Sequence, residues 1–177
     1  MKNPLTLFLV FTAVLQTSGS TLAQNLCAPD GRVHLEIDRR SICEHADEWI
    51  RRFTARDLDG LMALYVPDAV VALHGQPMLE GLPEVRTYFG KTMPSARSVQ
   101  FELDVERIEV YGDIVHLLSK YWFISTRQDG SVIRDAGRSF LVYRQDVTQS
   151  GFGRWKIALD IDQNTPDVMF PEPSARR

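Results

Sequence analysis

The sequence predicts an α+β fold, in which one domain folds a curved antiparallel sheet over helices. Apolar residues first recur at the spacing of amphipathic helices, and between residues 57 and 73 this pattern changes to a β-branched run. From residue 101 onward, apolar residues alternate along segments that turn signals separate, which is typical of antiparallel strands. A length of 177 residues suits one domain with a sizeable core.

The first helix is predicted to begin at Ser41, because Ser41 and Glu44 form a capping-box pattern. Its apolar face would consist of Ile42, Ala46, Trp49, Ile50 and Phe53. Residues 24–40 are expected to form an N-terminal arm. Within this arm Val33, Leu35 and Ile37 alternate like a short extended segment.

Residues 57–73, with the sequence DLDGLMALYVPDAVVAL, are predicted to form a helix, a turn and a strand. Asp57 is expected to cap the helix, and Pro67 to end it, because proline lacks the N–H donor and disfavours helix before it. The apolar face would consist of Leu58, Leu61, Met62 and Tyr65. Residues 69–73 would form the strand.

A third helix is expected after Gly81, with Pro83 in its first turn and with Gly90 and Pro94 at its close. The β region follows, and its first strand alternates at Phe101, Leu103 and Val105 before the phase slips to Ile108 and Val110. This slip predicts a bulge near residues 106–107. Residues 111–113 and 129–130 are predicted turns. Residues 166–177 are expected to be a loose tail.

This order, a helix, a Pro-Asp turn and a strand between a longer helix and a long β region, resembles the nuclear transport factor 2-like superfamily. That superfamily includes SnoaL-like cyclases and ketosteroid isomerases. The resemblance spans roughly residues 41–164. It implies a cone-shaped, curved antiparallel sheet wrapped over three N-terminal helices. The expected organisation is a signal peptide at 1–23, an arm at 24–40, a SnoaL-like domain at 41–165 and a flexible tail at 166–177.

Aromatic and apolar side chains on the elements expected to face the cone interior predict a ligand pocket, because small-molecule sites are mostly apolar. The candidate ligand-binding residues are Trp49, Phe53, Tyr65, Val71, Leu73, Tyr88, Phe89, Tyr121, Phe123 and Phe140. The alternative interpretation is that these side chains fill an ordinary core.

Polar residues at inward positions are the candidate catalytic groups. Asp160 and Asp162 share one face of the last strand with Ala158, and the other face carries Trp155, Ile157, Leu159 and Ile161. Arg138 is expected to point inward from the preceding strand, in phase with Phe140, and to pair with Asp160 or Asp162. Such a group could act as a general acid or base, with His74 and His116 as further candidates. The alternative is a structural ion pair at the cone mouth.

Ketosteroid isomerase chemistry is not expected, although the resemblance includes those enzymes. They use a carboxylate base, a tyrosine and a protonated aspartic acid. Aligned by the DLDG segment, these positions fall on Leu73, on Trp49, and on Phe140 or Ser139. Because leucine cannot take a proton, that mechanism is improbable.

Leu118, Trp122, Leu141, Tyr143 and Ile157 are predicted to form an apolar patch on the opposite sheet face. Exposed apolar patches mark interfaces, and superfamily relatives commonly dimerise here, so a homodimer is expected. The alternative is that the N-terminal arm covers the patch. The net charge of −3 argues against a nucleic-acid partner, and the sequence indicates no membrane partner, metal or cofactor.

The N-terminus is predicted to be a secretory signal. Lys2 precedes an apolar run over residues 5–15 that is too short to span a bilayer, and residues 21–23 resemble a cleavage site after Ala23. The protein would then be secreted or periplasmic; the alternative is a retained anchor. In such a compartment Cys27 and Cys43 are expected to form a disulfide, the alternative being two free thiols.

The sequence therefore supports two hypotheses. In the first, an exported SnoaL-like domain binds a small apolar or amphipathic molecule in its cone and performs acid/base chemistry of the isomerase, cyclase or hydrolase type. In the second, the domain is a non-catalytic homodimeric association module.

Overall fold

The computed structural model describes residues 33–170. Residues 1–32 and 171–177 lie outside the described residues. The predicted signal peptide, the cleavage after Ala23, residues 24–32 of the arm and Cys27 therefore stay untested. The disulfide between Cys27 and Cys43 also remains a prediction.

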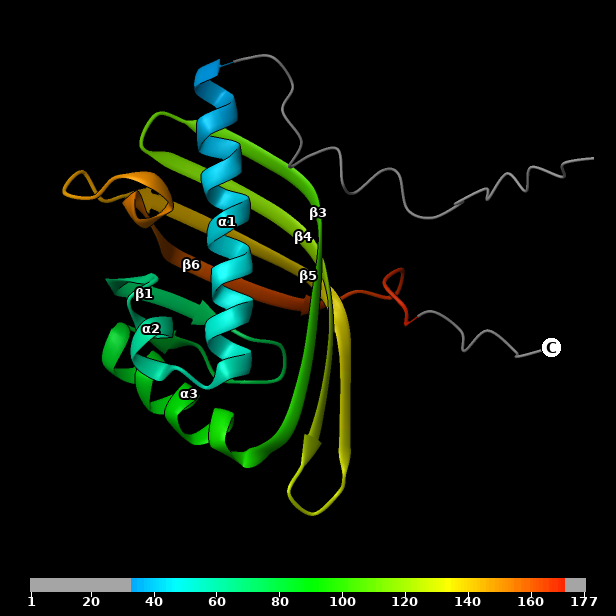
Figure 1. Ribbon diagram of the computed structural model, residues 1–177. Coiled ribbons are helices and arrows are strands. Elements are labelled where there is room, and N and C mark those ends of the chain that lie inside the picture. The colour runs from blue at the N-terminus through cyan, green and yellow to red at the C-terminus, as the bar shows by residue number, and fades with distance from the viewer. Residues whose placement is uncertain (1–32, 171–177) are drawn as a thin grey trace, which may run out of the picture.

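A six-stranded curved sheet and three α-helices form the described chain, which confirms the predicted α+β fold (Figure 1). The helices are α1 (Val33–Ala55), α2 (Leu58–Met62) and α3 (Leu82–Ser95), and a 3₁₀ turn, η2, spans Gly151–Arg154. The strands are β1 (Tyr65–Ala72), β2 (Leu79–Glu80), β3 (Ala96–Tyr111), β4 (Ile114–Arg127), β5 (Val132–Gln145) and β6 (Trp155–Asn164). Their order is β2-β1-β6-β5-β4-β3, and every neighbouring pair is antiparallel except β1 with β6.

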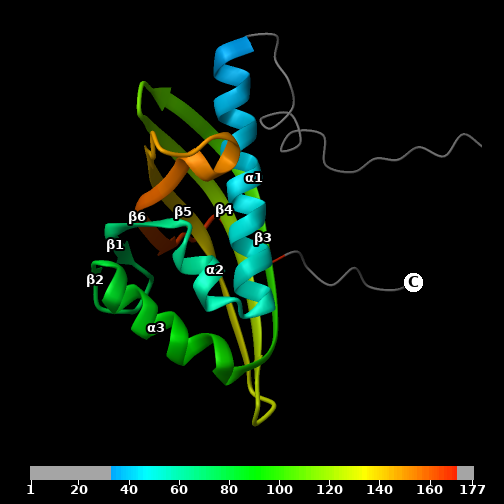
Figure 2. The ribbon, with the colours of Figure 1, turned by 60° about the vertical axis from the view of Figure 1, so that its left-hand side comes forward.

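The helices cover one face of the sheet. Helix α1 runs along the concave face and packs on β3 and β6, while α3 packs on β1 and β3 (Figures 1 and 2). Figure 2 shows α2 and α3 on the same side of the sheet as α1. This arrangement encloses space between the concave face of the sheet and the helices.

The predicted bulge in the first long strand is confirmed. Val105 pairs with Ser119 and Arg107 with Leu118, so Glu106 is the extra residue of β3. The bulge keeps apolar residues on the concave face before and after it. Both predicted turns are also confirmed, and Gly112 and Gly130 adopt positive φ angles of 65° and 84° there.

A second bulge, in β6, overturns the simple alternation expected for the last strand. Tyr143 pairs with Ile157 but Val142 pairs with Leu159, so Ala158 is an extra residue. The bulge places Ile157 and Asp160 on the same, concave side. The predicted outer patch is therefore wrong for Leu141, Tyr143 and Ile157, which face the helices as part of the core.

Two predicted boundaries are also wrong. Helix α1 begins at Val33 rather than at Ser41, so Val33, Leu35 and Ile37 are helical rather than extended. Helix α2 ends at Met62, and Pro67 lies inside β1. Between Tyr65 and Val70 the pairing of β1 with β6 is interrupted, so a residue without an N–H is tolerated there. Helix α3 follows Gly81 and ends at Ser95, directly after Pro94, in agreement with its predicted close.

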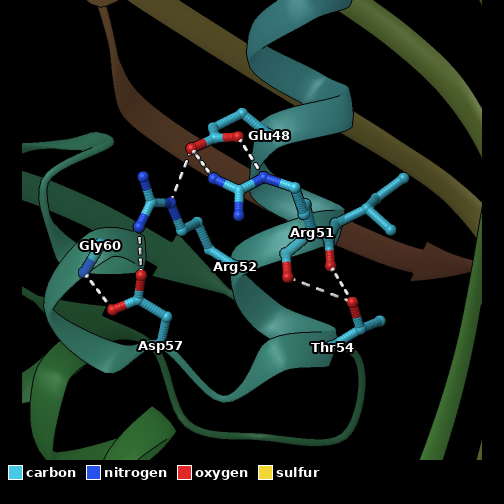
Figure 3. A network of polar contacts seen from close by, with 7 residues as sticks. Glu48, Arg51, Arg52, Thr54, Asp57 and Gly60 are labelled. Atoms are coloured by element: carbon cyan, nitrogen blue, oxygen red, sulfur yellow. Dashed lines mark hydrogen bonds and ion pairs between the residues drawn. The ribbon is translucent and has the colours of Figure 1, made fainter.

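Charged residues hold the C-terminal end of α1 against α2 (Figure 3). Asp57 caps α2 as predicted, because its Oδ1 accepts from the Gly60 N–H at 2.9 Å. Arg52 pairs with Asp57 and donates to Glu48 at 2.6 Å, and Arg51 also donates to Glu48. This network fixes the helical turn that carries Trp49.

Residues 166–170 lie against the convex face of the sheet, contrary to the predicted loose tail. The Trp122 indole N–H donates to the Met169 carbonyl at 2.9 Å, and Val168 is buried. Arg134 lies over the Phe170 ring, 4.3 Å from its centroid. This segment covers part of the outer face that includes Trp122. The homodimer through that face remains a prediction.

Candidate functional site

A cavity of about 350 Å³ lies between the concave face of the sheet and the helices. Seven of the ten predicted ligand-binding residues line it: Trp49, Phe53, Leu73, Tyr88, Phe89, Tyr121 and Phe123. Tyr65 and Val71 are buried in the adjoining core. Phe140 lies on the convex face, with its ring centroid 5.5 Å from that of His116, because its neighbours Ser139 and Leu141 occupy the inward positions of β5.

One wall of the cavity is aromatic. The rings of Trp49 and Phe53 stack with centroids 5.0 Å apart, and Phe101 lies 5.4 Å from Trp49. Phe89 meets Trp49 edge-on at 6.3 Å. Such rings give an apolar surface suited to a flat or apolar ligand body. Phe101 was missed as a cavity residue, although its place in the alternating strand was predicted.

A chain of hydrogen bonds connects the aromatic wall to Asp160. The Trp49 Nε1–H donates to the Tyr65 hydroxyl oxygen at 2.7 Å, and that hydroxyl donates to Asp160 Oδ2 at 2.8 Å. Because an indole N–H can only donate, Tyr65 must accept from Trp49, and its own proton points to Asp160. A proton on the Asp160 carboxyl group therefore belongs on Oδ1, the other oxygen.

Asp160 and Asp162 form a pair of carboxyl groups in the cavity. They line it from successive inward positions of β6, opposite Leu141 and Ser139. Burial and the neighbouring Asp162 charge raise the pKa of Asp160 to about 8, against the Tyr65 hydrogen bond. Burial and the Asp135 charge raise the pKa of Asp162 to about 6, against a hydrogen bond from Ser139. Near neutral pH the pair therefore holds about one proton.

The predicted pairing of Arg138 with these carboxylates is wrong. Arg138 donates to Glu106 at 2.7 Å and to Asp167 at 2.8 Å on the convex face. The reason is strand alternation, since Ser139 is the residue of β5 that faces Asp162. Because the Arg138 guanidinium does not reach the cavity, it does not lower the pKa values of Asp160 and Asp162, which burial and like charge raise.

A second polar group lies in the cavity around Asp135. The Tyr121 hydroxyl donates to Asp135 Oδ2 at 3.1 Å, and His74 Nδ1 lies 3.8 Å from the same oxygen. Asn164 donates to Oδ1 at 3.4 Å. The His74 side chain is 51% exposed and that of Asp135 is 30% exposed, so this group lies nearer solvent than Asp160. His116 lies apart from it, beside Phe140.

Sequence reasoning missed Asp135, Ser139 and Tyr143 as cavity residues. Alternation from Phe123 across the 129–130 hairpin could have placed Asp135 inward. Tyr143 is fully buried, and among the described residues its hydroxyl finds no hydrogen-bond partner. Within residues 33–170 no three His, Cys, Asp or Glu side chains are arranged to hold a metal ion.

A family model described as a SnoaL-like domain matches residues 42–158, so the chain belongs to this family. The match ends before Asp160 and Asp162. Among curated proteins, none matches the sequence. Along residues 33–170, every helix is too short or too polar to pass through a bilayer.

Solved structures similar to this chain share its fold. A nuclear transport factor 2-like superfamily protein from Salmonella enterica serovar Typhimurium is 18% identical, with a TM-score of 0.63, covering 71% of this chain and 89% of its own. A dehydratase candidate of the same family from Streptomyces avermitilis is 21% identical, with a TM-score of 0.61 and coverages of 73% and 97%. A ketosteroid isomerase-like protein from Erwinia carotovora atroseptica is 19% identical, with a TM-score of 0.59 and coverages of 72% and 95%. At these identities the likeness establishes the cone-shaped fold alone.

Proposed function

We propose that this SnoaL-like domain binds a small amphipathic molecule in its cavity and transfers protons on it with Asp160 and Asp162. The observation that carries the proposal is the position of two carboxyl groups, sharing about one proton near neutral pH, beside an aromatic wall. General acids and bases are most effective when their pKa values lie near the working pH.

The two carboxyl groups have different roles in this proposal. Asp162 has the lower pKa and is the base, which takes a proton from a carbon next to a ligand carbonyl. Asp160 is the acid, and its Oδ1 proton passes to the carbonyl oxygen while Tyr65 holds Oδ2. These transfers form an enol and leave Asp160 ionised and Asp162 protonated. In a ligand with a carbon–carbon double bond conjugated to the enol, Asp162 returns its proton to the far carbon of that double bond and the enol proton returns to Asp160. The double bond then shifts toward the carbonyl, which gives a positional isomer and restores the pair.

The aromatic wall supplies binding energy for the apolar part of the ligand. Fully burying one aromatic or aliphatic group contributes about 1.5–3 kcal/mol. The carboxyl pair lines the same cavity from β6 and orients the polar end of the ligand. The S. avermitilis and E. carotovora structures, described as a dehydratase candidate and as ketosteroid isomerase-like, are consistent with this class of chemistry.

The test begins with native mass spectrometry on the protein purified without detergent, before and after incubation with a mixture of small apolar ketones. The proposal expects a retained or acquired small molecule. Deuterium uptake into that molecule in D₂O then measures proton transfer at carbon. Asp162→Asn should slow the uptake at least 100-fold, and Asp113→Asn, in the exposed β3–β4 turn, should not. No bound molecule, or uptake independent of Asp162, would overturn the proposal.

A further inference from the structure

Asp135 is the third aspartate that lines the cavity. It lies on β5, the strand that pairs with β6, which carries Asp160 and Asp162. On the concave face of β5, Leu141 lies opposite Asp160, Ser139 opposite Asp162, and Gly137 opposite Asn164. Asp135 is the next inward residue of β5 toward the hairpin. The three carboxyl groups thus follow one line along the interior surface of the sheet.

Gly137 leaves the interior surface open between Asp135 and Ser139. It has no side chain to separate Asp135 from Asp162. It also cannot gain one without movement of the backbone, because a Cβ atom there would lie 1.9 Å from the Gln163 carbonyl oxygen. The close approach of β5 and β6 therefore leaves no room for a side chain at this position, and the Asn164 side chain opposite it reaches Asp135.

Polar side chains from three parts of the chain surround Asp135. Tyr121 on β4 and Asn164 on β6 donate to its two oxygens, and His74, beyond β1, faces Oδ2 at 3.8 Å. Tyr121 cannot supply a positive charge, and neither can Asn164. Among the described residues lining the cavity, the basic side chains are His74 and the exposed Arg127.

The groups that face Asp162 are likewise without a formal positive charge. They are Asp160 on its own strand, Ser139 and Asp135 on β5, and the hydroxyls of Tyr65, Tyr88 and Tyr121. Of these, Asp135 carries the negative charge that reaches closest to solvent. Its negative charge acts on Asp162 within the shared cavity.

We infer that Asp135 is a positioning residue that acts through Asp162, and that its carboxylate keeps the shared proton on the Asp160–Asp162 pair. The inference rests on the proposed function, because it assigns the residue that tunes the proposed acid and base.

The test is a ¹³C NMR titration of the aspartate carboxyl carbons in the ligand-free protein, compared among variants. In the unchanged protein Asp160 and Asp162 should both titrate well above ordinary aspartates. Asp135→Asn should lower the titration midpoint of Asp162 by about one pH unit, and Asp135→Glu should restore it because the charge is kept. Asp113→Asn is the control for loss of a distant exposed carboxylate.

The outcomes separate this inference from the proposed function. If the pair titrates high and Asp135→Asn leaves Asp162 unchanged, the inference is wrong and the proposed acid/base pair stands. An equal drop in the Asn and Glu variants would also overturn it, because it would reflect lost packing rather than lost charge. If both aspartates titrate near 4 in the unchanged protein, both proposals fail.

Discussion

The indole N–H of Trp49 donates a hydrogen bond to the hydroxyl oxygen of Tyr65 at 2.7 Å. These residues are 16 positions apart, one on α1 and the other at the start of β1. The bond directs the Tyr65 proton toward Asp160 and thereby selects which carboxyl oxygen can carry a proton. The position of a helix residue on the cavity wall thus determines the orientation of the proposed acid.

Replacing Tyr65 by phenylalanine removes the hydroxyl that donates to Asp160. Because this hydrogen bond lowers the pKa of Asp160, the Tyr65→Phe variant should show a still higher Asp160 pKa. It should also unfold with a free energy lower by about 1–2 kcal/mol, since Trp49 and Asp160 each lose a buried partner. Denaturant unfolding and carboxyl NMR measure both effects. Tyr111→Phe, on an exposed tyrosine, is the matched control, and a similar loss there would contradict the account.

The buried pair makes stability depend on pH. The pKa of Asp160 is raised from 3.8 to about 8 on folding, so its contribution to stability is fully present below pH 4. That contribution is lost as pH rises through about 8, because ionisation of the buried group opposes folding. Asp160→Asn removes this loss and should be more stable than the unchanged protein at pH 9, by about 1–3 kcal/mol. Urea unfolding of both proteins at pH 5 and pH 9 measures this difference. If Asp160→Asn lowered the free energy of unfolding by the same amount at both pH values, Asp160 would not be a buried neutral acid.

His45 should produce the opposite dependence at acidic pH. It is fully buried beside the Tyr143 ring, and burial lowers its pKa to about 4. The unfolded chain therefore binds a proton below pH 6.5 that the folded chain excludes, and stability is lost as pH falls toward 4. His45→Gln should reduce this acid sensitivity in thermal unfolding between pH 4 and pH 7. The account would be contradicted if the variant kept the whole slope.

Arg138 should matter to the convex face rather than to the cavity. Arg138→Gln removes its bonds to Glu106 and Asp167, and the unfolding free energy should fall only slightly, since these ion pairs are partly exposed to solvent. The Asp160 and Asp162 titrations should remain where they are. NMR titration of this variant is the check, and an upward shift of either midpoint would show that the guanidinium acts on the cavity after all.

Gly137 should tolerate no side chain. Gly137→Ala places a methyl group against the Gln163 carbonyl and should destabilise the fold by about 2 kcal/mol or more. Gly153→Ala is the matched control, because nothing lies within 4 Å of a Cβ at Gly153. Thermal unfolding of the two variants gives the comparison. Equal stability would mean that β5 and β6 can separate at this point without cost.

The sequence predicted the fold well where signals were local. The slip of apolar phase at residues 106–107, the cap at Asp57 and the two β turns are each encoded within a few residues, and all are confirmed. The inward position of Asp160 and Asp162 was also predicted. The β6 bulge was not, because Ala158 carries no signal of its own, and this error moved Ile157 to the wrong face.

The errors at the site came from long-range pairing. Alternation within β5 allows either face to point inward, and the inward phase is decided by its register with β4 and β6. The choice of the other phase placed Arg138 and Phe140 in the cavity and left out Ser139 and Tyr143. The Trp49–Tyr65 bond joins elements that no local pattern connects. Tyr65 was moreover assigned to the helix, so its place beside Asp160 could not be predicted.

The most direct test of the account is the pH titration of the Asp160 and Asp162 carboxyl carbons by ¹³C NMR in the unchanged protein. The account predicts one group titrating below pH 7 and one above it, so that the pair holds one proton between them at neutral pH. Two midpoints near 4, the ordinary value for an aspartate, would mean that both carboxyl groups are ordinary carboxylates, and the proposed acid/base pair would not exist.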